Sequence, residues 1–96
     1  MSDSYYISIG NSDDKLSQME WSAYWSEVDL IVQHYAVEVH GVWVSLPNTP
    51  YQNACWCVTI HMGHAIENMR GELKWQAKKY KQDSIAFATA ETEFLR

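Results

Sequence analysis

Residues 37–62 contain the pattern that most restricts how this chain can fold. They read VEVHGVWVSLPNTPYQNACWCVTIHM, two runs rich in β-branched and aromatic residues on either side of a loop that contains two prolines. Two such runs separated by turn residues are typical of a β-hairpin. A hairpin is not stable alone in water, so the segments before and after it must cover one of its faces.

The alternation of side chains in the two runs predicts how the hairpin strands pair. With Ser45 opposite Ala54, Trp43 lies opposite Trp56 on an apolar face that we expect to point into the core. The other face then collects a modestly apolar patch of four residues, Val42, Val44, Cys55 and Cys57. No other segment is expected to cover this patch, so it is the predicted oligomer face, against which a second copy would pack.

Amphipathic helices are expected on both sides of the hairpin. Residues 17–20 (SQME) have the form of a capping box, with Ser17 at the N-cap and Glu20 at N3, and an apolar stripe follows to about Tyr35. A second apolar stripe at helical spacing predicts a helix over about residues 65–81.

Two further strands complete a βαββαβ order. Residues 5–9 (YYISI) alternate and stop at the turn sequence GNSDD, and residues 85–94 alternate with three alanines on one face. With right-handed crossovers, this order predicts a ferredoxin-like α+β fold, a four-stranded antiparallel sheet of order 4-1-3-2 with both helices on one face. We expect a single domain over residues 1–96, and a different α+β arrangement is the main alternative.

Composition argues against several classes of protein. The formal net charge of −5 argues against a general nucleic-acid binder, and the central strands lack the aromatic pattern of RNA-binding sheets. No apolar run approaches the length of a membrane span, and the N-terminus lacks the layout of a signal peptide. We therefore expect a cytoplasmic protein with no membrane contact, in which Cys55 and Cys57 are reduced thiols.

The predicted topology places three polar loops at one end of the sheet. These loops contain the candidate binding residues Asn11, Asp13, Asp14, Tyr51, Gln52, Asn53, Gln82 and Asp83. Such residues commonly make turns and helix caps, which is one reading of this cluster. The other reading is a polar recognition edge for a partner or ligand, or a weak cation site.

Cysteine and histidine side chains suggest a second candidate site. His40 is expected near Cys57 and His61 on the sheet face that no helix covers, where such groups could bind zinc or activate a thiol. Their spacing matches no standard zinc motif, so no metal and no cofactor are expected.

The predicted second helix carries a basic run and one exposed aromatic residue. The cations between residues 70 and 81 are expected to form its solvated face, although they could also contact phosphate. Trp75 lies among them and is a candidate partner-binding residue, because an exposed Trp is a typical interface anchor.

Three segments together resemble a known group of proteins. YYISIGNSDDKLSQ (5–18), QNACWCVTI (52–60) and YKQDSIAFATAETEFL (80–95) are similar to small uncharacterised proteins encoded by bacteriophages of actinobacteria. The resemblance implies a phage-encoded accessory protein that acts in the host bacterial cytoplasm, and it implies no activity or site.

These observations lead to one main hypothesis and two alternatives. The main hypothesis is a non-enzymatic protein that binds a host or phage protein, for instance to inhibit a host system, and that forms a homodimer. One alternative is a small-molecule or metal-binding domain that uses the polar loops or the Cys/His face. The other is a thiol enzyme that uses Cys57 with His40 or His61.

Overall fold

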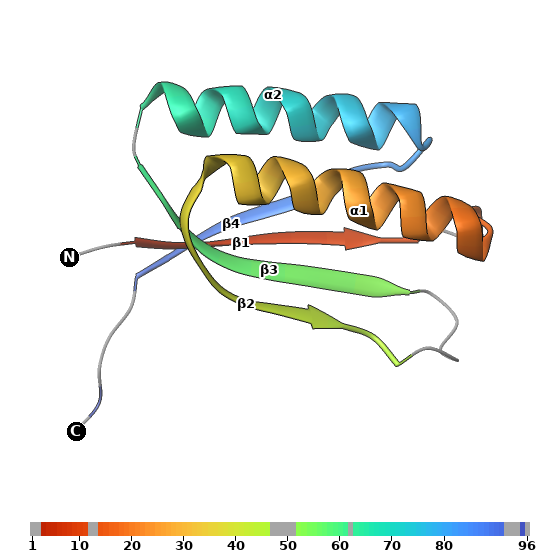
Figure 1. Ribbon diagram of the computed structural model, residues 1–96, viewed down its shortest axis with the longest axis horizontal. Coiled ribbons are helices and arrows are strands. Elements are labelled where there is room, and N and C mark those ends of the chain that lie inside the picture. The colour runs from red at the N-terminus through yellow and green to blue at the C-terminus, as the bar shows by residue number, and fades with distance from the viewer. Residues whose placement is uncertain (1–2, 12–13, 47–51, 62, 92–94, 96) are drawn as a thin grey trace.

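The computed structural model describes residues 3–11, 14–46, 52–61, 63–91 and 95 of the chain. Their elements are β1 (Asp3–Gly10), α1 (Gln18–Tyr35), β2 (Ala36–Val44), β3 (Asn53–Ile60), α2 (His64–Lys79) and β4 (Ala86–Glu91). The four strands form one antiparallel sheet of order β2-β3-β1-β4, and both helices cover the same face (Figure 1). The expected ferredoxin-like α+β fold is confirmed. None of the helices in these ranges is long and apolar enough to cross a membrane.

Helix α1 begins at the capping box that the sequence predicts. The Ser17 hydroxyl accepts a hydrogen bond from the Glu20 backbone N–H at 3.2 Å, and the Glu20 carboxylate accepts one from the Ser17 N–H at 3.0 Å. These two bonds satisfy donors that every helix N-terminus leaves free. The same hydrogen bonds lower the pKa of Glu20. The apolar stripe of α1 is buried against the sheet.

Helix α2 is bounded by two residues with positive φ. Gly63 precedes the helix at φ 97°, a conformation that L-residues rarely adopt, and Lys81 follows it at φ 57°. The left-handed turn at Lys81 lets the Gln82 N–H donate to the Ala77 carbonyl at 2.8 Å, in the manner of a Schellman cap. This turn directs the chain from the helix end to the start of β4.

The core lies between the sheet and the two helices. Trp56 at its centre is fully buried, packs against Trp25 in a tilted arrangement at a centroid distance of 5.6 Å, and donates its indole N–H to Asp29 at 2.9 Å. Ile85, just before β4, and Phe87 within it pack against the core, whereas Ala86 and Ala88 are exposed. The odd-numbered residues of β4 therefore face the helices, a choice that alternation alone leaves open.

The predicted hairpin register is wrong by one residue. The structure pairs Val44 with Ala54 and Trp43 with Cys55, so Trp43 does not meet Trp56. Further along, the register shifts between Ala36 and Glu38 and between Val39 and Gly41. Each shift leaves one extra residue in β2, and an extra residue changes which face the following side chains occupy.

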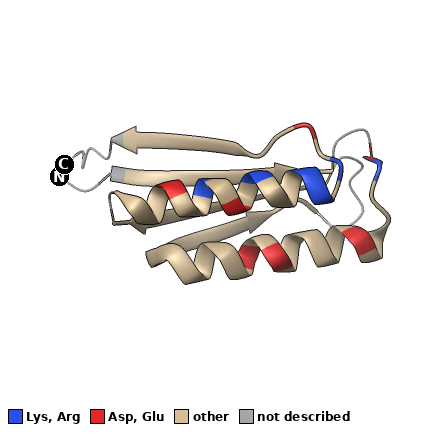
Figure 2. Ribbon diagram, turned by 90° about the horizontal axis from the view of Figure 1, so that it is seen from above, with Lys and Arg blue, Asp and Glu red and all other residues tan. Residues whose placement is uncertain are grey.

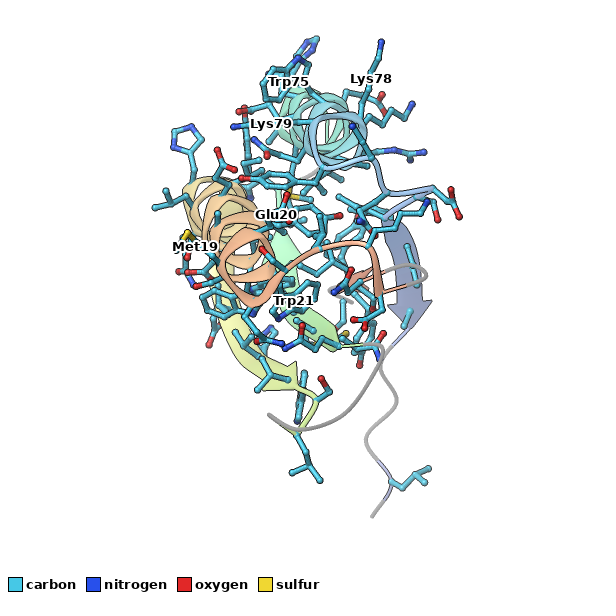
Figure 3. The ribbon with its side chains drawn as sticks, turned by 90° about the vertical axis from the view of Figure 1, so that its right-hand side faces the viewer. Met19, Glu20, Trp21, Trp75, Lys78 and Lys79 are labelled. Carbon is cyan, nitrogen blue, oxygen red and sulfur yellow. The ribbon has the colours of Figure 1, made fainter. Side chains whose placement is uncertain are left out.

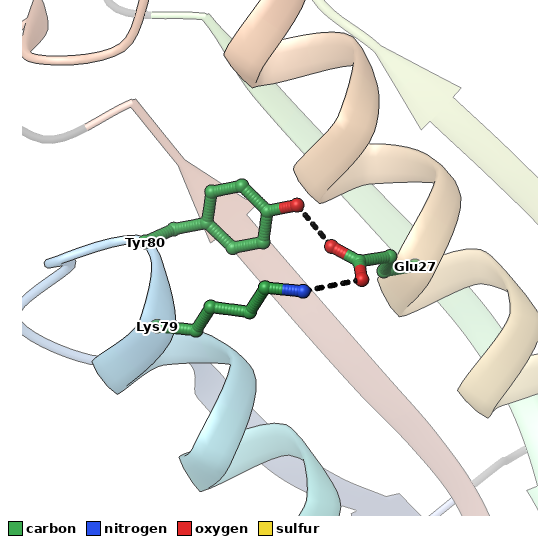
Figure 4. A network of polar contacts seen from close by, with 3 residues as sticks. All are labelled: Glu27, Lys79 and Tyr80. Atoms are coloured by element: carbon green, nitrogen blue, oxygen red, sulfur yellow. Dashed lines mark hydrogen bonds and ion pairs between the residues drawn. The ribbon is translucent and has the colours of Figure 1, made fainter.

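Polar contacts join the two helices near their solvent side. Glu27 of α1 accepts a hydrogen bond from Lys79 at 2.7 Å and another from the Tyr80 hydroxyl (Figure 4). These two donors lower the pKa of Glu27. Burial, followed by the hydrogen bond with Glu27, raises the pKa of Tyr80 to about 12. Helix α1 carries acidic residues and no Lys or Arg (Figure 2), and its Glu27 neutralises Lys79 of α2.

Candidate functional site

The described residues of the three polar loops lie at one end of the sheet, here called the polar pole (Figure 1), but the most buried of them have structural partners. Asn11 is 2% exposed, and its side chain closes the loop before α1: its Oδ1 accepts from the Leu16 N–H at 2.9 Å and its Nδ2 donates to the Leu16 carbonyl at 3.0 Å. The Asn11 backbone N–H donates to the Gln52 carbonyl at 2.8 Å and joins the first loop to the hairpin. Asn11 is therefore a structural residue of this pole.

The other candidates of the polar pole differ in accessibility. Gln52 is buried and donates to Gln18 at 3.0 Å, and Gln82 is buried and donates to the Tyr80 carbonyl at 3.1 Å. Three others, Asp14, Asn53 and Asp83, are exposed. Asp13 and Tyr51 lie outside the described residues. Fewer residues of the polar pole are therefore exposed to solvent than the sequence suggested.

The uncovered face of the sheet has a different composition from the one expected. Val42 and Val44 pair with Trp56 and Ala54, whose side chains point toward the helices, so they do not share a face with Cys55 and Cys57. The expected four-residue oligomer face is therefore divided between two faces of the sheet, because the register is shifted by one residue. In its place, the uncovered face carries the indole of Trp43, which is 57% exposed and lies opposite Cys55.

The neighbours of Trp43 are small or uncharged. A Cβ atom on Gly41 would lie 3.1 Å from the Trp43 ring, so the indole occupies the space that a larger residue at position 41 would need. Across the sheet, Tyr6 lies opposite Cys57, and its hydrogen bond with that thiol raises the pKa of Tyr6. The middle of this face is therefore a surface of ring, thiol and hydroxyl groups.

The histidine and cysteine candidates do not assemble into a metal centre. His40 shares a 2.8 Å hydrogen bond with the Thr59 hydroxyl, and its other ring nitrogen lies 3.9 Å from Glu38. His61 is exposed, whereas Cys57 is buried. Within the described ranges, no three His, Cys, Asp or Glu residues come together as metal ligands.

A groove between α2 and β4 is a site that the sequence interpretation missed. It has a volume of about 420 Å³ and is lined on the helix side by Arg70, Leu73, Lys74, Ala77 and Lys78. On the strand side it is lined by Gln82, Asp83, Ser84, Ile85 and Phe87. The sequence does contain a signal for this groove, because Arg70, Lys74 and Lys78 are spaced four residues apart and such residues form one row on a helix. From the sequence alone, that row is expected to be a solvated helix face.

Trp75 is exposed as the sequence predicts. The residue is 59% exposed and lies at the top of α2, away from the sheet, with the Lys79 ammonium group 5.5 Å from the ring centroid (Figure 3). Trp75 and Trp43 therefore mark two separate surfaces, one on the helix layer and one on the uncovered sheet face. A binding role for Trp75 stays a prediction.

Comparisons with known proteins assign no family. No family model matches the chain, and no curated protein matches it. Among solved structures, one similar chain is a Burkholderia cenocepacia protein assigned provisionally as an amidohydrolase/peptidase, with a TM-score of 0.37 and 11% sequence identity. The match covers 96% of this chain but only 28% of the other. A likeness at this level carries no argument about fold or function.

Proposed function

We propose that this protein is a non-enzymatic interaction protein that self-associates through the uncovered face of its sheet. The observation that carries the proposal is the Trp43 indole, which is more than half exposed on a sheet face without a helix layer. Exposed Trp and Tyr residues on such a face are typical anchors of protein interfaces. Tyr6 supplies a second ring on the same face.

The charge of this face favours a second copy as the partner. The chain carries a formal net charge of −5, so two copies repel each other unless they meet where carboxylates are scarce. Among the described side chains that alternation places on this face, Glu38 at the edge strand β2 is the one carboxylate. An uncharged patch of rings, thiols and small residues can pack against its own copy without an unpaired buried charge.

The size of this face sets the expected strength of self-association. Strands of six to nine residues are about 20–30 Å long, and four of them about 4.8 Å apart give a footprint of roughly 500 Å². A standard interface buries about 800 Å² on each partner, so we expect a weak dimer that forms at micromolar or higher concentration. The two register shifts in β2 disfavour edge-to-edge pairing at that strand, and face-to-face packing is the mode that would bury Trp43.

The test is a concentration series in sedimentation velocity or light scattering on the purified chain. We expect the average molecular mass to rise toward that of a dimer as the concentration increases. We expect Trp43→Ser to move the monomer–dimer midpoint to a concentration at least tenfold higher. Trp75→Ser is the matched control, because Trp75 is exposed to the same extent but lies on the helix layer. A strict monomer at millimolar concentration would refute the proposal, and so would equal behaviour of the two variants.

A second part of the proposal concerns a further partner. The resemblance to actinobacterial phage proteins supports binding to a host or phage protein, with inhibition of a host system as the outcome. Affinity capture from lysate of an actinobacterial host, with the wild type and both Trp variants as baits, tests this part. We expect one protein to be retained by the wild type and lost with one of the variants. Recovery of nothing beyond the empty-resin control would count against it.

A further inference from the structure

The groove between α2 and β4 combines an apolar floor with a basic rim. Leu73 and Ala77 of α2 are buried beneath it, and Ile85 and Phe87 at β4 pack against the same core. Arg70, Lys74 and Lys78 form the rim on the helix side. A volume of about 420 Å³ lies within the range of small-molecule sites, which are apolar pockets with a few placed polar groups.

The three rim cations differ from Lys79 in what they contact. Lys79 is paired with Glu27, whereas no ion pair joins Arg70, Lys74 or Lys78 to another residue in the described part of the chain. The Arg70 guanidinium lies over the Phe87 ring, 5.4 Å from its centroid, which holds its charge above the apolar floor. The rim of the groove therefore carries positive charge in a chain whose formal net charge is −5.

The one carboxylate of the groove lining indicates where an anion would bind. Asp83 belongs to the loop after α2, so it lies toward the Lys78 end of the groove, while Arg70 lies one turn beyond Lys74 in the other direction. Because like charges repel, an anionic group is favoured near Arg70 and Lys74. A polyanion would also meet the negative field of the rest of the chain, which disfavours nucleic acid.

We propose that this groove binds a small ligand with an apolar, ring-sized body and a single anionic group. The body packs on Leu73, Ile85 and Phe87, and the carboxylate, sulfonate or phosphate contacts Arg70 and Lys74. This site lies on the helix side of the sheet and is separate from the self-association face around Trp43. Its test is therefore independent of the function proposed above.

The probe is 8-anilinonaphthalene-1-sulfonate, and its neutral counterpart N-phenyl-1-naphthylamine is the control ligand. Fluorescence titration of the folded wild type is expected to show saturable binding of both. Arg70→Gln is expected to weaken binding of the sulfonate about threefold to tenfold and to leave the neutral ligand within twofold. Lys15→Gln makes the same change of charge outside the groove and is expected to alter neither affinity.

Two further measurements locate the site. Ser84→Trp places a large ring in the groove and is expected to abolish binding of both ligands, with the circular dichroism spectrum of the wild type retained. Amide shifts on addition of the sulfonate are expected to concentrate at residues 70–78 and 84–88 in heteronuclear NMR spectra. Shifts that concentrate instead around Tyr6 and Trp43, or equal sulfonate affinity for Arg70→Gln and the wild type, would overturn the proposal.

Discussion

Replacement of Asn11 by Ala tests whether the polar pole is built for folding or for binding. The Asn11 side chain is almost completely buried and makes two hydrogen bonds to the backbone of Leu16. Removal of the amide leaves the Leu16 N–H and C=O without these partners, in a residue that is itself buried. A buried polar group that loses its partner costs about 1–3 kcal/mol.

The two groups together predict a loss of about 2–6 kcal/mol in the free energy of unfolding. For a domain of this size, each kcal/mol lowers Tm by about 4–8 °C, so Tm should fall by at least about 8 °C. Urea unfolding followed by tryptophan fluorescence, with thermal melts by circular dichroism, measures both quantities. The midpoint in urea should fall without a change in the slope, because the surface exposed on unfolding stays the same.

Matched variants separate the structural role from other effects. Asn11→Asp keeps the acceptor for the Leu16 N–H, loses the donor to its carbonyl and brings a charge beside Asp14, so it should destabilise at least as much as Asn11→Ala. Asp14→Asn tolerates the φ of 54° at that position and should stay within about 0.5 kcal/mol of the wild type. A wild-type stability for Asn11→Ala would refute the structural role of this side chain.

Two further predictions concern helix boundaries and pH. Gly63→Ala should lower the free energy of unfolding by about 1–3 kcal/mol, because φ is 97° at that position. Gly71→Ala, inside α2 with open space around it, should raise the free energy of unfolding by about 0.5–1 kcal/mol. Urea unfolding of both variants checks these opposite signs. The pKa of Glu27 is lowered in the folded state, so its contribution is present above its unfolded pKa and is lost as pH falls through the lower folded value. Glu27→Gln should therefore lose less stability than the wild type on acidification, and an identical acid profile would contradict this. The pKa of Tyr80 is raised to about 12, so stability should fall as pH rises from about 10 to 12, and less so in Tyr80→Phe.

Local patterns predicted the elements of this fold well. The capping box at Ser17 and Glu20 is a contact between residues three apart, so the sequence shows it directly, and the structure contains both of its bonds. The exposure of Trp75 follows in the same way from its position opposite the apolar stripe of α2. The order of strands followed from the handedness of the connections, which few topologies satisfy.

The candidate sites were predicted less well because they depend on contacts between distant segments. The uncovered face contains Trp43 instead of Val42 and Val44, since one extra residue between Val39 and Gly41 changes which of the following side chains point outward. Strict alternation offers no sign of where such a residue lies. Burial of Asn11 and Gln52, which were candidates for binding, likewise depends on the approach of two loops about forty residues apart.

The features that the sequence predicts and those that it does not differ for one physical reason. Helix caps, side-chain periodicity and turn residues act within a few positions of the chain, so the sequence contains them in readable form and determined the six elements and their order. Register, burial at the polar pole and the groove between α2 and β4 arise where segments far apart in sequence pack together. Arg70, Lys74 and Lys78 become the rim of a groove only because β4 lies beside α2 with Phe87 beneath Arg70, and that placement was decided by the tertiary structure.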